Sequence, residues 1–391
     1  MKILILTDEL YPKPSANGIC VKNILNLFRD DEIYILSTNA YQYSNNDNYN
    51  GWTIQRLRYQ NKKRLTVFDK ALSFLKLLFS YNVSFKLVNE YVLEASKIIE
   101  KESIDLVVSF SRPYDSSYAL IKLRKKYRDL PLISVFFDAP GCMKYKYNLF
   151  NKVWTRRTIS FLRHLSKVST KVVLMEYAQK ANPNIYSVNY GHNVHFLDLP
   201  CFIPQEQKRE DLVLKDGTGI ISFTGVLDYH YRNPSRCLEV LLSSIVKYGL
   251  KYKVHFYGNG CESILEGFQK KYEDIFYYHG LVPQETIDCV LQQSSIFINI
   301  GNHSLKQLPS KIFSYFSTGK PVLNFYFDDD DLSLSYFQEY KNQLSIHISE
   351  KCDESEIGKF LSSTRTIPAE ELGKMFPNNH PSSFYALFKD V

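Results

Sequence analysis

The chain has 391 residues, more than one ordinary core holds, so two domains of roughly 200 residues each are expected. Hydrophobic residues make up 45% and charged residues 23%, which is typical of a folded soluble protein. No apolar window could span a bilayer, the N-terminal run is too short for a signal segment, and the seven cysteines lack the spacing of a zinc site or a disulfide framework. We therefore expect a cytoplasmic protein.

The first half alternates short apolar runs with segments of helical spacing. Residues 2–6 read as a buried strand, and a loop with Asn17 and Gly18 leads into a helix through residues 19–28. Further strands are predicted, in chain order, at residues 31–38, 103–111, 130–138, 170–175 and 184–191. Six strands with intervening helices predict one doubly wound domain that ends near residue 200.

Residues 193–219 hold two prolines, many charges and no clear period, so we interpret them as a linker. Alternation then resumes, with strands predicted at 219–225, 252–260, 296–300 and 321–327 and helices at 234–249, at 285–293 and from 310. The predicted fold class is α/β, with two tandem Rossmann-like domains facing across a cleft. Their bounds are 1–200 and 201–375, and a return of the tail, 376–391, to the first domain is left open.

In a parallel α/β sheet, ligands bind at the carboxyl ends of the strands. The candidate residues at these ends are Asn17, Gly18, Arg112, Asp138, Gly225, Arg232, Gly258 to Gly260, Ser310 and Lys311.

Two pairs of these candidates point to phosphate. Pro309-Ser310 marks a helix start, whose free amides together with the Lys311 charge could hold a phosphate; ordinary capping is the alternative. Gly225 lets a backbone approach a ligand closely, and Arg232 offers a bidentate fork to phosphate oxygens. A loop glycine with a solvated arginine is the alternative here, but together the features favour a diphosphate.

Three stretches of the second half, residues 223–241, 277–300 and 308–323, carry a family resemblance. They are similar to the donor domain of GT-B glycosyltransferases, in particular the family 4 group of bacterial surface-polysaccharide enzymes. The first half resembles the same group more loosely, through residues 15–28 and 110–141.

The resemblance implies transfer of a sugar from a nucleotide diphosphate sugar, with the UDP type favoured, to an acceptor hydroxyl with retention of configuration. It places the donor against Asn17, Gly18, Gly225, Arg232, Gly258, Pro309, Ser310, Lys311 and Ser314. The family has two glutamates separated by seven residues, the second of which holds the donor ribose, and Lys306 and Ser314 stand at these positions. A serine hydroxyl binds a ribose less strongly than a carboxylate does.

Asp138 is the one carboxylate carried over from the family, as an acceptor-orienting or catalytic group; a turn or N-cap aspartate is the alternative. Helix amides with Arg232 and Lys311 can stabilise a leaving diphosphate, so neither a metal nor a cofactor is expected. We interpret Asp328–Asp331 as a solvated turn, because four consecutive side chains cannot all converge on one ion.

The first half is basic. Residues 1–200 carry 29 Lys and Arg against 17 Asp and Glu, and the rest of the chain carries 19 against 24. Residues 56–64 hold five cations and no acid, and residues 139–175 hold eight and no acid, with Phe150, Trp154 and Phe161 interleaved. Such segments favour helices at an anionic membrane surface. Helices packed on their own sheet are the alternative, and nucleic acid is disfavoured because no recognised motif is present.

These observations predict a cytoplasmic glycosyltransferase, peripherally bound to the inner face of the cell membrane, that acts on a lipid-linked or cell-surface glycan. One alternative is a sugar-nucleotide epimerase of the same fold. Another is a catalytically silent binding or scaffold subunit, which the replacement of glutamate by Lys306 and Ser314 favours.

Overall fold

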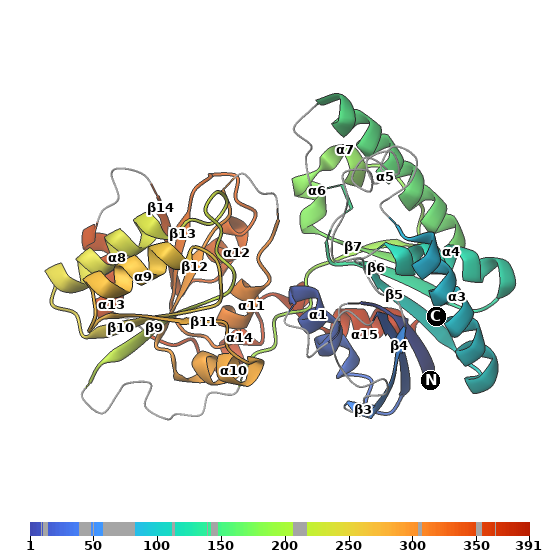
Figure 1. The fold of residues 1–391 in the computed structure, drawn as a ribbon, viewed down its shortest axis with the longest axis horizontal. Coiled ribbons are helices and arrows are strands. Elements are labelled where there is room, and N and C mark those ends of the chain that lie inside the picture. The colour runs from blue at the N-terminus through green and yellow to red at the C-terminus, as the bar shows by residue number, and fades with distance from the viewer. Residues whose placement is uncertain are drawn as a thin grey trace. The chain divides into compact units, whose positions relative to one another are not determined.

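The computed structural model describes residues 1–8, 10, 15–38, 48–49, 51–57, 83–111, 114–138, 140–141, 148–205, 217–303, 307–348, 354–363 and 365–391. They form two compact units, each with its own sheet (Figure 1). Unit 1 comprises Met1–Pro200 and Pro381–Val391, and unit 2 comprises Cys201–His380.

Unit 1 is built on an eight-stranded sheet of order β3-β4-β2-β1-β5-β6-β7-β8, parallel except for the β3–β4 pair. Its strands are β1 (Lys2–Leu6), β2 (Glu32–Thr38), β3 (Asn48–Tyr49), β4 (Trp52–Leu57), β5 (Leu106–Ser111), β6 (Leu132–Phe136), β7 (Lys171–Met175) and β8 (Val194–Leu197). Its helices are α1 (Ala16–Leu25), α3 (Phe85–Glu102), α4 (Asp115–Lys126), α5 (Asn148–Val168), α6 (Tyr177–Ala181), α7 (Pro183–Tyr186) and α15 (Ser382–Lys389).

The central strands of unit 1 are apolar runs that are buried along their length, as a parallel sheet covered on both faces requires. The helices begin where the sequence offers caps. The hydroxyl of Ser15 accepts a hydrogen bond from the Gly18 amide at the start of α1, and Ser84 does the same for the Leu87 amide at the start of α3.

Two predictions for the first half are wrong. Residues 184–191 are not a strand, because Pro183 opens the short helix α7, in which Ile185 and Tyr186 are buried. The segment interpreted as a linker contains β8, which pairs in parallel with β7. Strand β4 was also not predicted.

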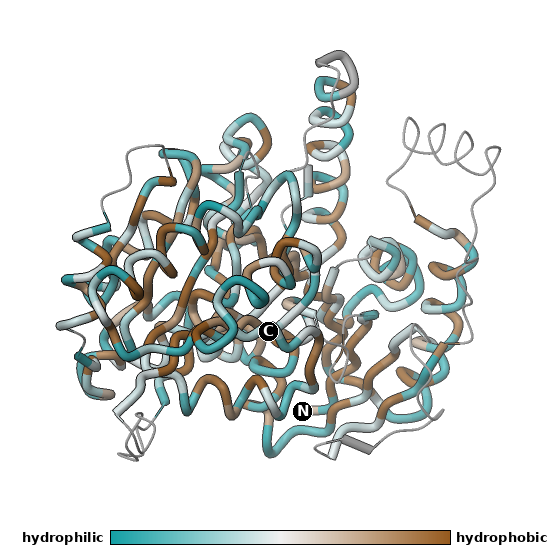
Figure 2. The backbone as a smooth tube through the Cα atoms, turned by 60° about the vertical axis from the view of Figure 1, so that its left-hand side comes forward, coloured by the Kyte–Doolittle hydropathy of each residue, from teal (hydrophilic) through white to brown (hydrophobic). Residues whose placement is uncertain are grey.

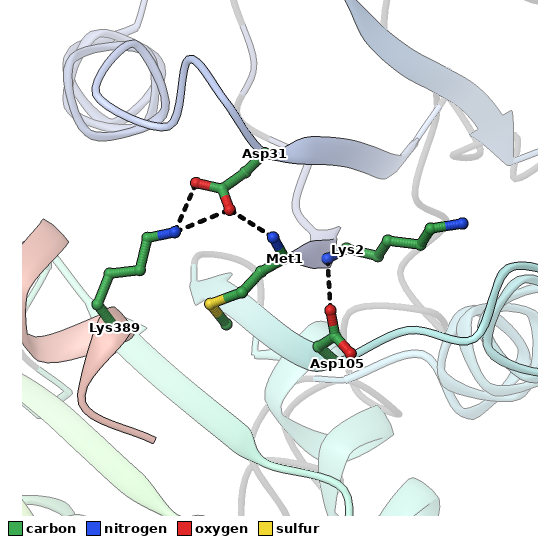
Figure 3. A network of polar contacts seen from close by, with 5 residues as sticks. All are labelled: Met1, Lys2, Asp31, Asp105 and Lys389. Carbon is green, nitrogen blue, oxygen red and sulfur yellow. Dashed lines mark hydrogen bonds and ion pairs between the residues drawn. The ribbon is translucent and has the colours of Figure 1, made fainter.

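The chain's last helix belongs to unit 1. Lys389 of α15 forms an ion pair of 2.7 Å with Asp31, and the amino group of Met1 contacts the same carboxylate at 2.7 Å (Figure 3). The Lys2 amide donates to Asp105 nearby. Burial alone would raise the pKa of the Asp31 carboxyl, but Lys389 and the amino group lower it below its ordinary value.

Unit 2 is built on a fully parallel six-stranded sheet of order β11-β10-β9-β12-β13-β14. Its strands are β9 (Gly219–Thr224), β10 (Tyr252–Tyr257), β11 (Phe276–Gly280), β12 (Ile296–Ile300), β13 (Val322–Tyr326) and β14 (Gln343–His347). Its helices are α8 (Ser235–Lys247), α9 (Glu262–Lys271), α10 (Gln284–Gln293), α11 (Lys311–Phe316), α12 (Leu334–Glu339), α13 (Glu354–Ser362) and α14 (Ala369–Leu372).

One apolar core joins this sheet to α8, α9 and α13, and it includes Ile221, Phe256, Leu241, Leu265 and Ile357. Figure 2 shows the resulting pattern along the tube, where hydrophobic stretches in the strands alternate with the hydrophilic outer sides of the helices. The prediction of two Rossmann-like α/β domains is confirmed.

Candidate functional site

The sheet of unit 2 reverses its strand order between β9 and β12. From β9 the chain adds β10 and β11 on one side and then places β12 on the other side of β9. Open α/β sheets bind ligands outside the carboxyl ends of the strands at such a point. The segments that follow β9 and β12 carry Gly225, Arg232 and Lys311, so three predicted site residues lie at this position.

Two glycines bring the backbone segments after β9 and β10 into close contact. Gly225 and Gly258 have φ values of +141° and +130°, and a Cβ atom on Gly258 would lie 1.8 Å from the Gly225 carbonyl oxygen. The Gly225 amide donates to Tyr257, and the Leu227 amide donates to Asn259. The close approach of these segments is enough to require a glycine at position 258, whether or not a ligand binds there. Gly225, in contrast, lies next to the Lys311 side chain.

Arg232 is held in a tight loop beside the contact between the segments of Gly225 and Gly258. Its Nη1 donates to the Val226 carbonyl at 3.0 Å, and its Nη2 donates to the Asn302 side chain at 2.6 Å. Asp228 stabilises the loop by accepting from the His230 and Tyr231 amides. Burial lowers the pKa of the Arg232 guanidinium, but an arginine stays charged in proteins. Its Nε has no hydrogen-bond partner within the described part of the chain.

The amine of Lys311 is buried next to Arg232. Its Nζ lies 3.8 Å from the centre of the Phe223 ring, and a Cβ on Gly225 would lie 3.4 Å from it. Among the residues that the structure describes, none forms a hydrogen bond with this amine. Burial, and then the charge of Arg232, hold the pKa of Lys311 well below its ordinary value. Two groups that only donate hydrogen bonds thus lie together with donor capacity unused, an arrangement that suits an anion.

Helix α11 begins where the sequence predicts, after Pro309 and Ser310, but it is only six residues long and no side chain caps its first turn. A dipole this short contributes little, so the Arg232 guanidinium, rather than the helix amides, gives the site its positive charge, and the Lys311 amine adds unused hydrogen-bond donors. Ser314 lies one turn after Ser310 on the same helix. Lys306 lies outside the described residues.

Tyr315 fixes α11 to the carboxyl end of β9 and to Phe297 of β12. Its ring stacks on Phe297 with the centroids 4.5 Å apart, and its hydroxyl accepts from the Thr224 amide at 2.9 Å. Burial raises the pKa of Tyr315 to about 12, so it stays neutral at physiological pH. This contact orients the helix that carries Lys311.

Two neighbours of the site were not predicted as such, Phe223 and Asp331. Asp331 accepts from the amide and hydroxyl of Ser333, and its charge acts on Arg232. Asp328 of the same acidic run instead pairs with His303 at 3.2 Å. Asp331 follows the carboxyl end of β13, which is the signal that could have identified it.

Within the described ranges, no group of three or more His, Cys, Asp or Glu side chains is placed to hold a metal ion.

In unit 1 the strand order reverses between β1 and β5, and Asn17 and Asp138 lie on segments that follow the carboxyl ends of β1 and β6. The Asn17 amide donates to an Asp138 carboxylate oxygen at 3.1 Å. Gly18 is buried and donates its backbone N–H to the Ser15 cap, so its role is in the helix start. The structure thus joins Asn17 to Asp138. Arg112 lies outside the described residues.

The backbone around Asp138 is fixed from below by α6 and α7. Tyr177 donates its hydroxyl hydrogen to the Phe137 carbonyl at 2.9 Å, and Tyr186 donates to the Pro140 carbonyl at 2.6 Å. Gly141, with a φ of +79°, leaves room for Ile185, which a Cβ would approach to 2.6 Å. The Asp138 carboxylate is therefore held on a supported turn.

Sequence reasoning missed two buried groups at the same edge, Asp115 and Tyr91. The Asp115 carboxylate accepts from the Ser84 amide at 2.7 Å, and burial raises its pKa. Tyr91 is fully buried, and its hydroxyl finds no partner among the residues described. Burial, with the charges of Asp8 and Asp115, raises the pKa of Tyr91 well above its ordinary value. The positions of Asp115 and Tyr91 depend on tertiary packing, which no sequence motif predicts.

Helix α5 carries the second basic segment. Its buried side holds Phe161, Leu162 and Leu165. Its exposed side holds four cations in one row, Lys152, Arg156, Arg163 and Lys167, at spacings of four and seven residues. Most of the first basic segment, from residue 58 on, lies outside the described residues, as does the side chain of Phe150. No described helix is both long and apolar enough to cross a membrane.

No family model and no curated protein sequence matches the chain. Solved structures do match it. Sucrose-phosphate synthase from Thermosynechococcus elongatus is 12% identical over 99% of this chain and 95% of its own, with a TM-score of 0.60. HepE from Anabaena, solved with UDP and glucose, is 11% identical over 99% and 95% of the two chains, with a TM-score of 0.56. A glycosyltransferase from Rickettsia africae is 11% identical over 100% and 98%, with a TM-score of 0.57.

At these identities the likeness shows the fold, which is the GT-B type with two Rossmann-like domains. The assignment to family 4 stays a prediction.

Proposed function

We propose that the protein is a glycosyltransferase whose donor is a nucleotide diphosphate sugar of the UDP type, with the diphosphate bound by Lys311 and Arg232. The observation that carries this proposal is the buried Lys311 amine, which lies beside a second cation and uses none of its donors on a described residue. Phosphate oxygens would satisfy both groups. The presence of UDP in the HepE structure, whose fold this chain shares, supports the choice of base.

The chemistry follows from charge. As the bond between the sugar and the diphosphate breaks, negative charge develops on the leaving oxygen, and fixed positive groups in a buried site stabilise it. Arg232 is such a group, and Lys311 becomes one when it is protonated, so the proposed transfer needs no metal. The Asp138 carboxylate, oriented by Asn17, would position the acceptor hydroxyl or accept its proton. Retention of configuration is proposed from the family resemblance.

The proposed acceptor is a lipid-linked or cell-surface glycan, reached from an anionic membrane surface. The row of exposed cations on α5 supports this, because each cation near an anionic leaflet contributes about 1 kcal/mol. Sedimentation with vesicles tests it. Binding to phosphatidylglycerol vesicles, absent with phosphatidylcholine and lost when Arg156 and Arg163 are replaced by Gln, is the expected result. Equal binding to both vesicle types would remove the membrane from the proposal.

The donor proposal is tested by transfer itself. Purified protein is incubated with UDP-sugars and with extracted glycolipids, and the products are detected by mass spectrometry. Sugar transfer that is lost in Arg232→Ala and kept in the control Arg236→Ala is expected, because Arg236 is an exposed residue paired with Glu239 on α8. Transfer that survives Arg232→Ala unchanged would exclude the site.

A silent binding or scaffold subunit is the second candidate. The observation in its favour is Ser314, which stands where the resemblance places the ribose-binding glutamate. Binding of both UDP and glycan without turnover under any tested donor would favour this candidate over the transferase. An epimerase would instead convert a soluble sugar nucleotide with no acceptor present.

A further inference from the structure

We propose that the site between β9 and β12 binds its anion together with a proton: the amine of Lys311 is uncharged when the site is empty and becomes an ammonium when a diphosphate group binds. This inference deepens the proposed donor site and rests on it. It concerns what the buried lysine does, and it makes binding at this site dependent on pH.

The geometry requires an explanation for a lysine in this place. The Lys311 amine is buried, contacts the face of the Phe223 ring at 3.8 Å, and donates to no residue in the described part of the structure. An ammonium ion taken out of water without a hydrogen-bond partner is costly, and a neutral amine is much less so. The face of the Phe223 ring is only a weak hydrogen-bond acceptor for the N–H groups of Lys311.

The charges around the Lys311 amine also favour its neutral form. Arg232, on the loop after β9, is the charge that acts on Lys311 directly, and it opposes a second positive charge. Helix α11 carries no acidic residue in its first turn. Tyr315 on α11 has a pKa raised to about 12 and contributes no charge near neutral pH. Asp228 and Asp331 act on Arg232; Asp331 accepts from Ser333 through one carboxylate oxygen, and its other oxygen is buried without a hydrogen-bond partner among the described residues.

A diphosphate changes this balance. It brings at least two negative charges to a position where one permanent cation, Arg232, already lies, and it supplies the acceptors that the amine lacks. The ammonium form of Lys311 then becomes the favoured form. The balance of the step is one proton taken from solution and one new N–H···O bond to a phosphate oxygen. The ligand's own titration would instead release protons, because cations lower the pKa of a phosphate.

Linkage makes the effect measurable. Where the empty site is neutral and the filled site is protonated, one proton is bound with each ligand, so the dissociation constant rises about tenfold for each pH unit. The window lies between the lowered pKa of Lys311 in the empty site and its higher pKa in the site that holds the diphosphate. A permanently charged residue at position 311 would show no such slope.

Calorimetry on the full chain tests the inference. UDP and inorganic pyrophosphate are each titrated at about pH 8 in buffers of different ionisation enthalpy, for wild type, Lys311→Met and the control Lys270→Met. Lys270 is an exposed lysine on α9. Uptake of close to one proton by wild type and by the control, with no uptake by Lys311→Met, is expected.

The outcomes separate the two proposals. UDP binding without proton uptake overturns this inference and leaves the donor site standing. Pyrophosphate binding with uptake, in the absence of UDP binding, supports the inference and removes the nucleotide from the proposed function. Binding of neither ligand overturns both. As a second measurement that needs no variant, the Lys311 pKa of the empty wild type is followed by NMR of ¹³C-labelled lysine, and titration at about pH 10.4 would by itself overturn the inference.

Discussion

The two sheets carry opposite chemistry around the points where their strand order reverses. In unit 1 the groups found there are carboxylates, Asp138 with Asn17 and the buried Asp115. In unit 2 they are chiefly two basic side chains, Arg232 and Lys311, whose Nε and Nζ atoms are buried, with the Asp331 carboxylate nearby. Each arrangement is opposite to the net charge of its half, since residues 1–200 are basic and the remainder is acidic. Net charge therefore describes the outer surface, such as the row of cations on α5, while a few buried groups decide what a site can bind.

Asp138→Asn, which removes the carboxylate of unit 1, has the largest expected effect. Turnover should fall by roughly 10²–10⁴, the range of general acid–base catalysis, while the dissociation constant for UDP stays unchanged. Steady-state kinetics and calorimetry on the same preparation give both numbers. Unchanged turnover would assign Asp138 to the turn alone.

Gly258→Ala tests the backbone contact beneath the cationic site. The new Cβ would meet the Gly225 carbonyl oxygen, and the φ of +130° disfavours any L side chain, so a loss of about 3 kcal/mol or more in the free energy of unfolding is expected. Urea denaturation measures it. The control Gly267→Ala, in the exposed middle of α9 with nothing within 4 Å, should instead stabilise by about 0.5–1 kcal/mol. Similar values for the two variants would contradict the account.

Arg232→Ala tests whether the basic site of unit 2 binds phosphate. Loss of the fork to phosphate should weaken UDP binding by about 1–3 kcal/mol, or roughly tenfold to hundredfold. Calorimetry against Arg236→Ala provides the matched arginine control. An unchanged dissociation constant would remove Arg232 from the site.

Asp31→Asn has the smallest expected effect and belongs to unit 1, where it releases Lys389 of α15. The carboxyl pKa is lowered in the folded chain, so its contribution is present above the unfolded-state value of about 3.9 and is lost as the pH falls through the folded value. The variant should be less stable by about 1 kcal/mol near pH 7, and the difference should shrink as the pH falls below the unfolded-state value of about 3.9. A difference that persists at low pH would assign the effect to packing.

The sequence predicted the fold well where the signal was local. Apolar runs such as Leu132–Phe136 and Ile296–Ile300 are typical of central parallel strands, and Ser15 marks a helix start. It failed at Val194–Leu197, a short half-buried strand between polar segments, and at residues 184–191, whose β-branched and aromatic residues favour a strand although Pro183–Tyr186 form a helix.

For the site, position after a strand identified Gly225, Arg232 and Lys311 but not their state. That the Lys311 amine lies over Phe223, and that Arg232 donates to Asn302, depends on residues 88 and 70 positions apart in the chain. The same holds for Tyr91 beside Asp8 and Asp115. Such contacts exist only after the sheets assemble, and no local pattern encodes them.

The most direct test of the central claim is the thermal stability of wild type and Lys311→Met with UDP, GDP, ADP, CMP and dTDP. A nucleotide at about 100 times its dissociation constant stabilises a protein by about 2.7 kcal/mol, which is readily seen. We expect a clear upward shift of wild type with UDP and a much smaller shift of the variant. Without ligand, the variant should be at least as stable as wild type, because an unpartnered buried amine has been removed. No shift with any nucleotide, or equal shifts of the two proteins, would contradict the central claim.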